Sequence, residues 1–306
     1  MIRFPQLPST NSRPRIAIVP LSGAAVEGTN FALGEQQLRA AGYEVINYYD
    51  HAQRFQRFGA SDEQRIALLY QALENPHVDM VMSLRGSYGV SRILPQLDFQ
   101  RIAASNKLII GFSDINALHF ALLAKTQFGS LCGPMFCSDF ALENLRDFTQ
   151  THFASAIQTG STDVRFESDI AQELQIKGRL WGGNLAMLCH LVGTEFMPQI
   201  DDGILFLEDV AEHPYRVERM LLQLKMAGVL DRQRAIVLGD FSAYQLAAHD
   251  NGYDFAAMVS FVRSQFGLPI LTGLPFGHCA DKLSLFQGSS CVIESSGKDV
   301  HLKAQI

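Results

Sequence analysis

The 306-residue sequence lacks the features that mark membrane and secreted proteins. No run of about 18 apolar residues occurs, which is the length that a spanning helix needs, so we expect no contact with a membrane. The most apolar region, residues 108–124, contains Asp114, Asn116 and His119. The first residues carry no apolar segment of the secretory kind, which predicts that the protein stays in the cytoplasm.

Cysteine is scarce and scattered. The five cysteines form no CxxC pair, and an odd, dispersed set without an export signal favours reduced thiols in the cytoplasm. Cys132 and Cys137, with nearby histidines, could be interpreted as metal ligands. Zinc sites usually show closer paired spacing, so we expect no metal.

An excess of positive charge is also missing. The chain has 25 Lys and Arg against 31 Asp and Glu, a net charge of −6. Binding to phosphate backbones needs a basic face, so we expect no nucleic-acid partner. Apolar residues make up 47% of the chain and charged residues 18%, which predicts a folded protein with a sizeable core. The length favours two domains.

The first half of the chain alternates between predicted strands and helices. This alternation predicts an α/β domain with a parallel sheet, doubly wound in the flavodoxin or Rossmann manner, over residues 1–160. The predicted strands cover 15–19, 43–49, 78–84 and 107–111, and the predicted helices cover 29–41, 61–73 and 115–125.

The pattern changes near Gly160, where a polar stretch predicts a linker over residues 161–176. A smaller C-terminal α/β domain with a mixed sheet is expected over residues 177–306. Its predicted strands are 177–180, 203–207 and 235–239, with a turn at 181–184, helices at 185–192 and 214–227, and antiparallel strands within 283–302.

Ser113 is the first candidate for chemistry. In Gly111-Phe112-Ser113-Asp114 an apolar strand leads directly into a serine from which a helix begins. A hydroxyl on such a turn resembles a nucleophile elbow, although Ile115 departs from the GxSxG pattern. The alternative is that Ser113 is only a helix N-cap, a position that serine favours.

A serine nucleophile needs a base, and that base needs an orienting acid. Glu208 follows the apolar strand 203–207, and His278 follows a turn of proline and glycine. Both lie where a sheet of this kind would place its ligand-binding loops. The alternatives are a solvated loop carboxylate for Glu208 and an ordinary surface histidine for His278.

The loop Arg85-Gly86-Ser87-Tyr88-Gly89 also follows a predicted strand. Its glycines would allow the backbone to approach a ligand closely, and one N–H could stabilise an oxyanion. The sequence is not GxGxxG, so it gives little support for a dinucleotide. A plain turn between strand and helix remains the alternative.

Five segments in this order resemble one known family. They are RGSYG, GFSD, LWGGNLAML, GILFLEDVAEHPYRVERMLLQL and LPFGHCADK, and the resemblance extends from about Arg15 to Ile293. The sequence is similar to the LD-carboxypeptidases of bacterial murein recycling, a family that also contains the microcin C immunity peptidases.

The resemblance implies a serine peptidase with Ser113 as nucleophile, His278 as base and Glu208 as acid. It also implies an oxyanion hole formed by the backbone N–H groups of Gly86 and Asp114. Ser87 stands where the family more commonly has the second glycine of RGGYG.

The implied reaction removes the terminal D-alanine from a murein tetrapeptide without a metal or a cofactor. Arg85 is expected to contact a substrate carboxylate, with Ser87, Trp181 and Asn184 as further substrate contacts. The resemblance also implies a homodimer. The competing interpretations are a microcin C immunity-type amide hydrolase and a non-catalytic protein that binds a small anion through RGSYG.

Overall fold

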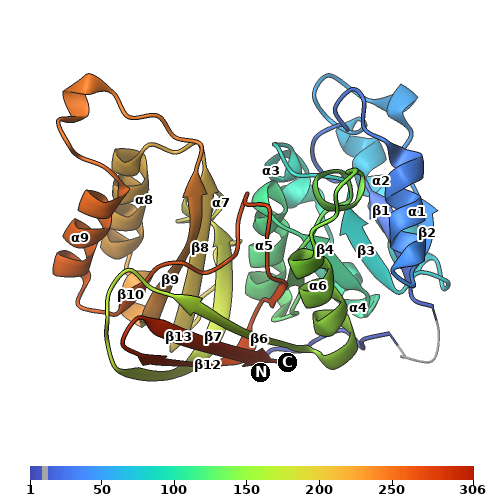
Figure 1. The fold of residues 1–306 in the computed structure, drawn as a ribbon. Helices are drawn as coiled ribbons and strands as arrows, with labels where there is room; N and C mark the ends of the chain where they lie inside the picture. The colour runs from blue at the N-terminus through green and yellow to red at the C-terminus, as the bar shows by residue number, and fades with distance from the viewer. Residues whose placement is uncertain (9–12) are drawn as a thin grey trace.

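The computed structural model describes residues 1–8 and 13–306, which form two lobes that are each built on one β-sheet (Figure 1). Among these residues no helix is long and apolar enough to span a bilayer. In the view of Figure 1 both chain ends are at the base of the molecule.

The first lobe contains a six-stranded sheet in the order β11-β5-β4-β3-β1-β2. Strands β1 to β5 are parallel, with the 2-1-3-4-5 order of doubly wound flavodoxin-like folds, so the predicted α/β class is confirmed. The strands are β1 (Arg15–Val19), β2 (Glu44–Asn47), β3 (Met80–Ser83), β4 (Leu108–Gly111), β5 (Leu131–Cys132) and β11 (Leu285–Phe286).

Helices cover this sheet. The α2 helix begins at the capping box that Ser61 and Gln64 form, in which each side chain accepts a hydrogen bond from the other's backbone N–H. The helices are α1 (Phe31–Ala40), α2 (Asp62–Glu74), α3 (Val90–Ile93), α4 (Phe99–Ala104), α5 (Asn116–Thr126) and α6 (Asp147–Thr159).

The second lobe contains a seven-stranded sheet in the order β10-β9-β8-β7-β12-β13-β6. The first four strands are parallel and the others antiparallel, which gives the predicted mixed sheet. Its elements are β6 (Ser161–Glu167), β7 (Leu174–Asn184), β8 (Gly203–Val210), β9 (Gln233–Ser242), β10 (Ile270–Leu271), β12 (Ser289–Ser296), β13 (Asp299–Gln305), α7 (Leu185–His190), α8 (Pro214–Met226) and α9 (Phe255–Phe266).

The linker predicted at residues 161–176 is wrong. Its first seven residues form β6, the edge strand of the second sheet, and pair with β13 along their whole length. Thr162 and Val164 are buried, while Asp163 and Arg165, which alternate with them, face solvent. This alternation is the period of a half-buried strand, and the polar outer face concealed it in the sequence.

The turn predicted at 181–184 is also wrong, because β7 continues through it. Gly182 and Gly183 have φ angles of 137° and 138°, and each faces a close neighbour. A Cβ on Gly182 would lie 1.9 Å from the carbonyl oxygen of Phe206, and one on Gly183 would lie 2.6 Å from the side chain of Asn116. The glycines therefore mark a close approach of backbone within a strand.

The α5 helix lies between the two lobes (Figure 1). Its residues from Asn116 to Leu123 are all buried, because it packs on the first sheet and also contacts β7 and α7. Near the N-terminal end of this helix, the loops that follow β3 and β4 of the first lobe meet the carboxyl end of β8 of the second. The carboxyl ends of parallel strands are where ligands bind in such folds.

Candidate active site

A chain of two hydrogen bonds connects three side chains across the lobes. His278 Nε2 lies 3.1 Å from Ser113 Oγ, and His278 Nδ1 lies 2.7 Å from Glu208 Oε2. Glu208 is fully buried, Ser113 is 9% exposed, and the His278 side chain is 24% exposed. The three residues that the sequence analysis selected are therefore brought together.

Ser113 sits on a strained turn. It is the first residue of a 3₁₀ turn between β4 and α5, and its φ of 62° lies in the left-handed region that non-glycine residues rarely adopt. The interpretation as an N-cap does not hold, because no side-chain cap bond occurs at this turn or at the start of α5. The geometry is that of a hydroxyl held on a sharp strand-to-helix turn at the edge of a pocket.

Gly86 lies directly against this turn. A Cβ built on Gly86 would be 2.9 Å from Ser113 Cβ and 3.0 Å from Ser113 Oγ, and it would be 3.6 Å from the backbone nitrogen of Asp114. The backbones of Gly86 and Asp114 therefore border the same small space beside the hydroxyl. Only a residue without a side chain fits there unless something moves.

The side chain of Asp114 points away from that space and ties three loops together. Its Oδ2 accepts hydrogen bonds from Ser22 Oγ at 2.6 Å and from the backbone N–H of Val90 at 2.9 Å. Burial raises the pKa of Asp114 despite these bonds. The loops that follow β1, β3 and β4 are thus held in fixed relation around Ser113.

Asn184 holds Glu208 from the other side. Its Nδ2 donates to Glu208 Oε1 at 3.2 Å and to Asp209 Oδ1 at 3.0 Å, while its Oδ1 accepts from the backbone of Met187 and caps α7. Burial and the charge of Glu208 raise the pKa of Asp209 to about 6. Asn184 therefore separates two buried carboxylates and fixes the orientation of one of them.

Electrostatics around His278 favour its protonated form. Burial lowers the pKa of His278, but the hydrogen bond and charge of Glu208, with a smaller contribution from Asp209, outweigh this effect. The pKa therefore lies above the ordinary value of 6.5. A carboxylate on Nδ1 also fixes the tautomer that leaves Nε2 free to accept the proton of Ser113.

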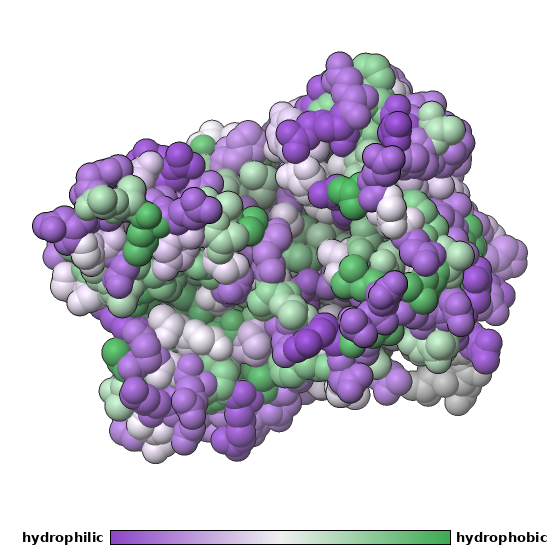
Figure 2. Space-filling view, turned by 45° about the horizontal axis from the view of Figure 1, so that its top comes forward, coloured by the Kyte–Doolittle hydropathy of each residue, from purple (hydrophilic) through white to green (hydrophobic). Residues whose placement is uncertain are grey.

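A pocket of about 240 Å³ opens beside Ser113, and the molecule is hollowed between its lobes (Figure 2). Cys137 faces it, but burial raises the pKa of this thiol to about 12, so it is a poor nucleophile at neutral pH. The lining residues are Val26, Arg85, Gly86, Ser87, Phe112, Ser113, Met135, Cys137, Ser138 and His278.

Two predicted substrate contacts lie in this lining. Arg85 donates from Nη1 to the carbonyl oxygen of Ala24 at 3.1 Å, which holds the guanidinium at the pocket. Ser87 has a φ of 95°, a conformation that glycine favours, so the replacement of the family's usual glycine leaves strain in this loop. Its hydroxyl accepts a hydrogen bond from Arg57 at 2.8 Å.

The other two predicted contacts are placed elsewhere. Trp181 is fully buried and donates from its indole N–H to Gln233 at 2.8 Å, so it is a core residue and presents no surface to a substrate at Ser113. Asn184 is 5% exposed, and its amide is occupied by the two carboxylates. Neither residue lines the pocket beside Ser113, so the predictions that Trp181 and Asn184 contact substrate are wrong. The local sequence does not show in which direction these side chains point.

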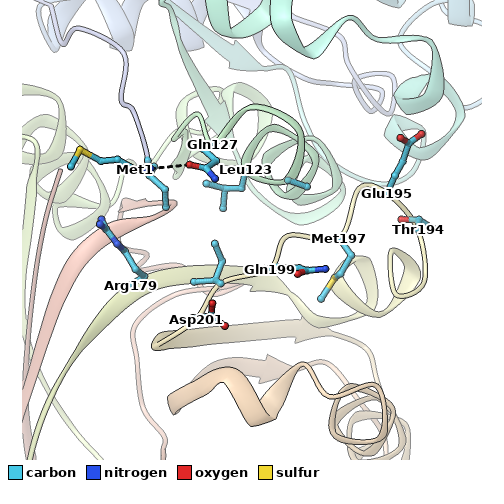
Figure 3. Close-up of a pocket in the computed structure, with 12 residues that line it drawn as sticks. Met1, Leu123, Gln127, Arg179, Thr194, Glu195, Met197, Gln199 and Asp201 are labelled. Carbon is cyan, nitrogen blue, oxygen red and sulfur yellow. Dashed lines mark hydrogen bonds between the residues drawn. The ribbon is translucent and has the colours of Figure 1, made fainter.

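A second hollow, of about 570 Å³, lies at the opposite end of α5 (Figure 3). The N-terminal ammonium of Met1 donates to Gln127 there, and two carboxylates of the lining are paired with cations. These are Glu195, with Lys125, and Asp201, with Arg232. This hollow is larger than the pocket beside Ser113 but brings together no nucleophile and base.

The sequence analysis missed several residues of the site. Ser22 carries no recognisable motif, and its bond to Asp114 depends on how the strands are arranged in space. Asp209 was visible as the second of two carboxylates at the end of an apolar run, which forms β8, yet its contact with Asn184 was not. Asp139 and Lys282 form a buried ion pair that spans 143 positions and that no local pattern indicates.

Such an arrangement can activate a hydroxyl. A buried carboxylate, an imidazole and a serine hydroxyl in series allow the imidazole to take the hydroxyl proton as the oxygen attacks a carbonyl carbon. Two backbone N–H groups beside the hydroxyl could stabilise the negative charge that then develops.

Two family models match the chain. The model of the LD-carboxypeptidase N-terminal domain matches residues 16–133, and that of the LD-carboxypeptidase C-terminal domain matches residues 177–293. The first match includes Ser113 and Gly86, and the second includes Glu208 and His278.

Individual proteins agree with these matches. The crystal structure of muramoyltetrapeptide carboxypeptidase from Oxalobacter formigenes superposes with a TM-score of 0.91 at 44% identity, covering 95% of this chain and 99% of that one. The murein tetrapeptide carboxypeptidase of Pseudomonas aeruginosa is 28% identical over 92% of this chain and 94% of its own. The microcin C7 self-immunity protein MccF of Escherichia coli is 27% identical over 90% of this chain and 88% of its own.

Proposed function

The chain belongs to the LD-carboxypeptidase family, and from this premise we propose that it removes the terminal D-alanine from murein tetrapeptides by a serine mechanism. The observation that carries the proposal is the hydrogen-bonded series Ser113–His278–Glu208 at the edge of a pocket. The 44% identity to a muramoyltetrapeptide carboxypeptidase over nearly the whole chain supports the choice of substrate.

In the proposed mechanism His278 takes the proton of Ser113 as the hydroxyl attacks the scissile carbonyl. This carbonyl belongs to the L-centre of the diamino acid, whose bond to D-alanine is cleaved. Glu208 keeps the imidazole in the required tautomer and stabilises the imidazolium. His278 then protonates the leaving amine, and water hydrolyses the acyl-enzyme on Ser113.

The oxyanion is proposed to lie between the backbone N–H groups of Gly86 and Asp114. Each donor would stabilise the transition state by roughly 3 kcal/mol, the value typical of oxyanion holes. Arg85, which lines the pocket, is proposed to bind the carboxylate of the terminal residue. A guanidinium suits this role because it can donate two parallel hydrogen bonds to a carboxylate.

The substrate proposal is tested by incubating the protein with defined murein tri-, tetra- and pentapeptides and following D-alanine release. We expect release from the tetrapeptide, and none from a tetrapeptide that ends in L-alanine. Absence of turnover of the tetrapeptide, with cleavage of a processed microcin, would instead indicate the immunity-type activity. Absence of turnover of both, with tight binding of a small anion, would indicate the non-catalytic alternative.

Three further expectations accompany the proposal. A role in recycling implies that the protein meets its substrate in the cytoplasm, which fractionation of the producing cell can check. A homodimer is expected from the family resemblance, and light scattering measures it. A nucleic-acid partner is not expected for a chain with a net charge of −6.

A further inference from the structure

A buried ion pair lies directly behind the proposed catalytic residues. Lys282 Nζ bonds to Asp139 Oδ1, and the two side chains are only 5% and 4% exposed. Lys282 follows His278 by four positions, whereas Asp139 belongs to a π-helical turn of the first lobe, Phe136–Phe140. The pair therefore connects the segment that carries the base to the other lobe.

On the Lys282 side, the contacts lead to the base. Lys282 donates from its backbone to Thr149 Oγ1 at 3.0 Å, and its ammonium lies 4.7 Å from the centre of the Phe112 ring. That ring in turn packs against His278, with 5.0 Å between the ring centres. Lys282 thus fixes both the backbone that follows His278 and the aromatic ring on which the imidazole rests.

On the Asp139 side, the contacts lead to the pocket wall. Asp139 Oδ2 accepts from the backbone N–H of Met135 at 2.8 Å and from Ser138 Oγ at 2.6 Å. Met135, Cys137 and Ser138 all line the pocket beside Ser113. Turns of this π type are frequent at functional sites, and here the turn points Asp139 away from the pocket and toward Lys282.

Stability alone gives little reason for such a pair. Removing two charges from water is costly, and an apolar pair of similar volume often stabilises a protein as well or better. A fixed geometry and a fixed charge are what an apolar pair could not supply. Here the pair supplies the geometry through the Phe112 ring, on which both Lys282 and His278 pack. It supplies the charge because Lys282 lowers the pKa of His278.

We propose that Lys282 and Asp139 are positioning residues of the reaction, which lock the His278 segment to the wall of the substrate pocket and keep a cation behind the base. The proposal deepens the proposed function and rests on it. Neither residue lines the pocket, so neither is expected to touch the substrate.

The charges around His278 explain why the cation matters. Glu208 and Asp209 on β8 raise the pKa of His278, and Lys282 lowers it. Asp240 on β9 also lies nearby, since a Cβ on Gly277 would approach its Cβ to 2.9 Å. Lys282 is thus the cation that opposes these carboxylates, and the carboxylate of Asp139 limits its effect.

The decisive variant removes both charges, Asp139→Leu with Lys282→Met, so that neither is left buried without a partner. We expect a folded protein with kcat/KM lowered about 10- to 100-fold, the loss typical of small displacements of catalytic groups. The acidic limb of the pH profile should move to higher pH. The single variant Lys282→Arg keeps a cation opposite Asp139, so it should retain most of the wild-type activity.

The matched control is the exposed pair Arg146–Asp281, which joins the same segment to the same lobe. Arg146→Ala with Asp281→Ala should leave kcat/KM within about 2-fold and the pH limb in place, because exposed pairs contribute little. If the double variant at Asp139 and Lys282 fails to fold, Asp139→Asn takes its place. A loss of kcat/KM larger than that of the Arg146 and Asp281 control supports the proposal, and an equal value contradicts it.

A histidine NMR titration keeps the two proposals apart, because it needs no substrate. A rise in the pKa of His278 in the Asp139→Leu, Lys282→Met protein supports the positioning role even if the wild-type protein releases no D-alanine. Unchanged kcat/KM together with an unchanged pKa of His278 would overturn it. Absence of D-alanine release by the wild type would count against the proposed function only.

Discussion

The two lobes prepare their parts of the site by different physical means. The first lobe places Ser113 and Ser87 in backbone conformations with positive φ and leaves room beside the hydroxyl only for Gly86. The second lobe supplies Glu208 and His278 through side-chain hydrogen bonds and buried charge. Strain in the backbone fixes the proposed nucleophile, whereas electrostatics fixes the proposed base, and the two kinds of arrangement should respond differently to mutation.

The largest effect is expected at the strained turn of the first lobe. Ser113→Ala should reduce turnover of the tetrapeptide at least several thousand-fold, as for other deletions of a nucleophile in a triad. Thermal unfolding should be nearly unchanged, because alanine at a φ of 62° carries the same backbone strain as serine. Turnover near that of the wild type would remove the serine mechanism.

The next effect tests whether the space beside Ser113 matters. Gly86→Ala would place a Cβ 3.0 Å from Ser113 Oγ, and we expect kcat to fall about 100-fold as the hydroxyl is displaced. Gly42→Ala is the matched control. That glycine has a φ of 95° with no atom within 4 Å of an added Cβ, so the substitution should cost stability but leave kcat unchanged. Equal kcat in both variants would contradict the role of Gly86.

A smaller effect is expected in the second lobe. Asn184→Ala removes the donor that separates Glu208 from Asp209, and kcat/KM should fall about 10-fold because the proposed acid is no longer held in place. It also removes the cap of α7, which costs about 1 kcal/mol of stability. Asp254→Ala removes the cap of α9, far from the site, and should match that loss of stability without the loss of activity.

The pH profile tests the electrostatic half of the comparison. His278 must be neutral to act as a base, and its pKa is raised, so kcat/KM should fall as the pH drops through a value above 6.5. Asp209→Asn removes one of the charges that raise this pKa, so the acidic limb should move by less than about one pH unit to lower values. A limb that moves upward would contradict this account of the charges.

The smallest effect concerns the strain at Ser87. Ser87→Gly suits a φ of 95° and should change the free energy of unfolding by no more than about 1 kcal/mol, because relief of strain is partly offset by the greater freedom of glycine in the unfolded chain. Urea denaturation measures the change. A loss of several kcal/mol would show that the bond from Arg57 to Ser87 Oγ holds the loop.

Local patterns in the sequence predicted much of the fold and the chemical core of the site. Alternating apolar segments predicted the first four parallel strands of the first sheet, and the helix predicted over residues 61–73 corresponds to α2, Asp62–Glu74. Ser113, Glu208 and His278 could be selected because each follows an apolar strand or a proline–glycine turn and falls in a segment that resembles the family.

Features that depend on distant contacts could not be predicted in this way. The polar outer face of β6 resembles a linker until its partner β13 is known. The prediction that Trp181 contacts substrate is wrong for the same reason. Nothing in the local sequence shows that this side chain lies in the core and donates its indole N–H to Gln233. The role of Asn184 also depends on two carboxylates that lie on a neighbouring strand.

The pairing of β11 with β5 has a consequence for synthesis on the ribosome. Strand β11 completes the first sheet: its Leu285 pairs with Cys132 of β5, and its Phe286 pairs with Leu131. An emerging chain therefore cannot close the edge of its first sheet until Phe286 has been translated. Domains that are contiguous in sequence can fold one after the other during translation, but here the first sheet is completed by β11, which follows most strands of the second lobe in the sequence. The first sheet is thus complete only in a chain that already contains His278, the proposed base.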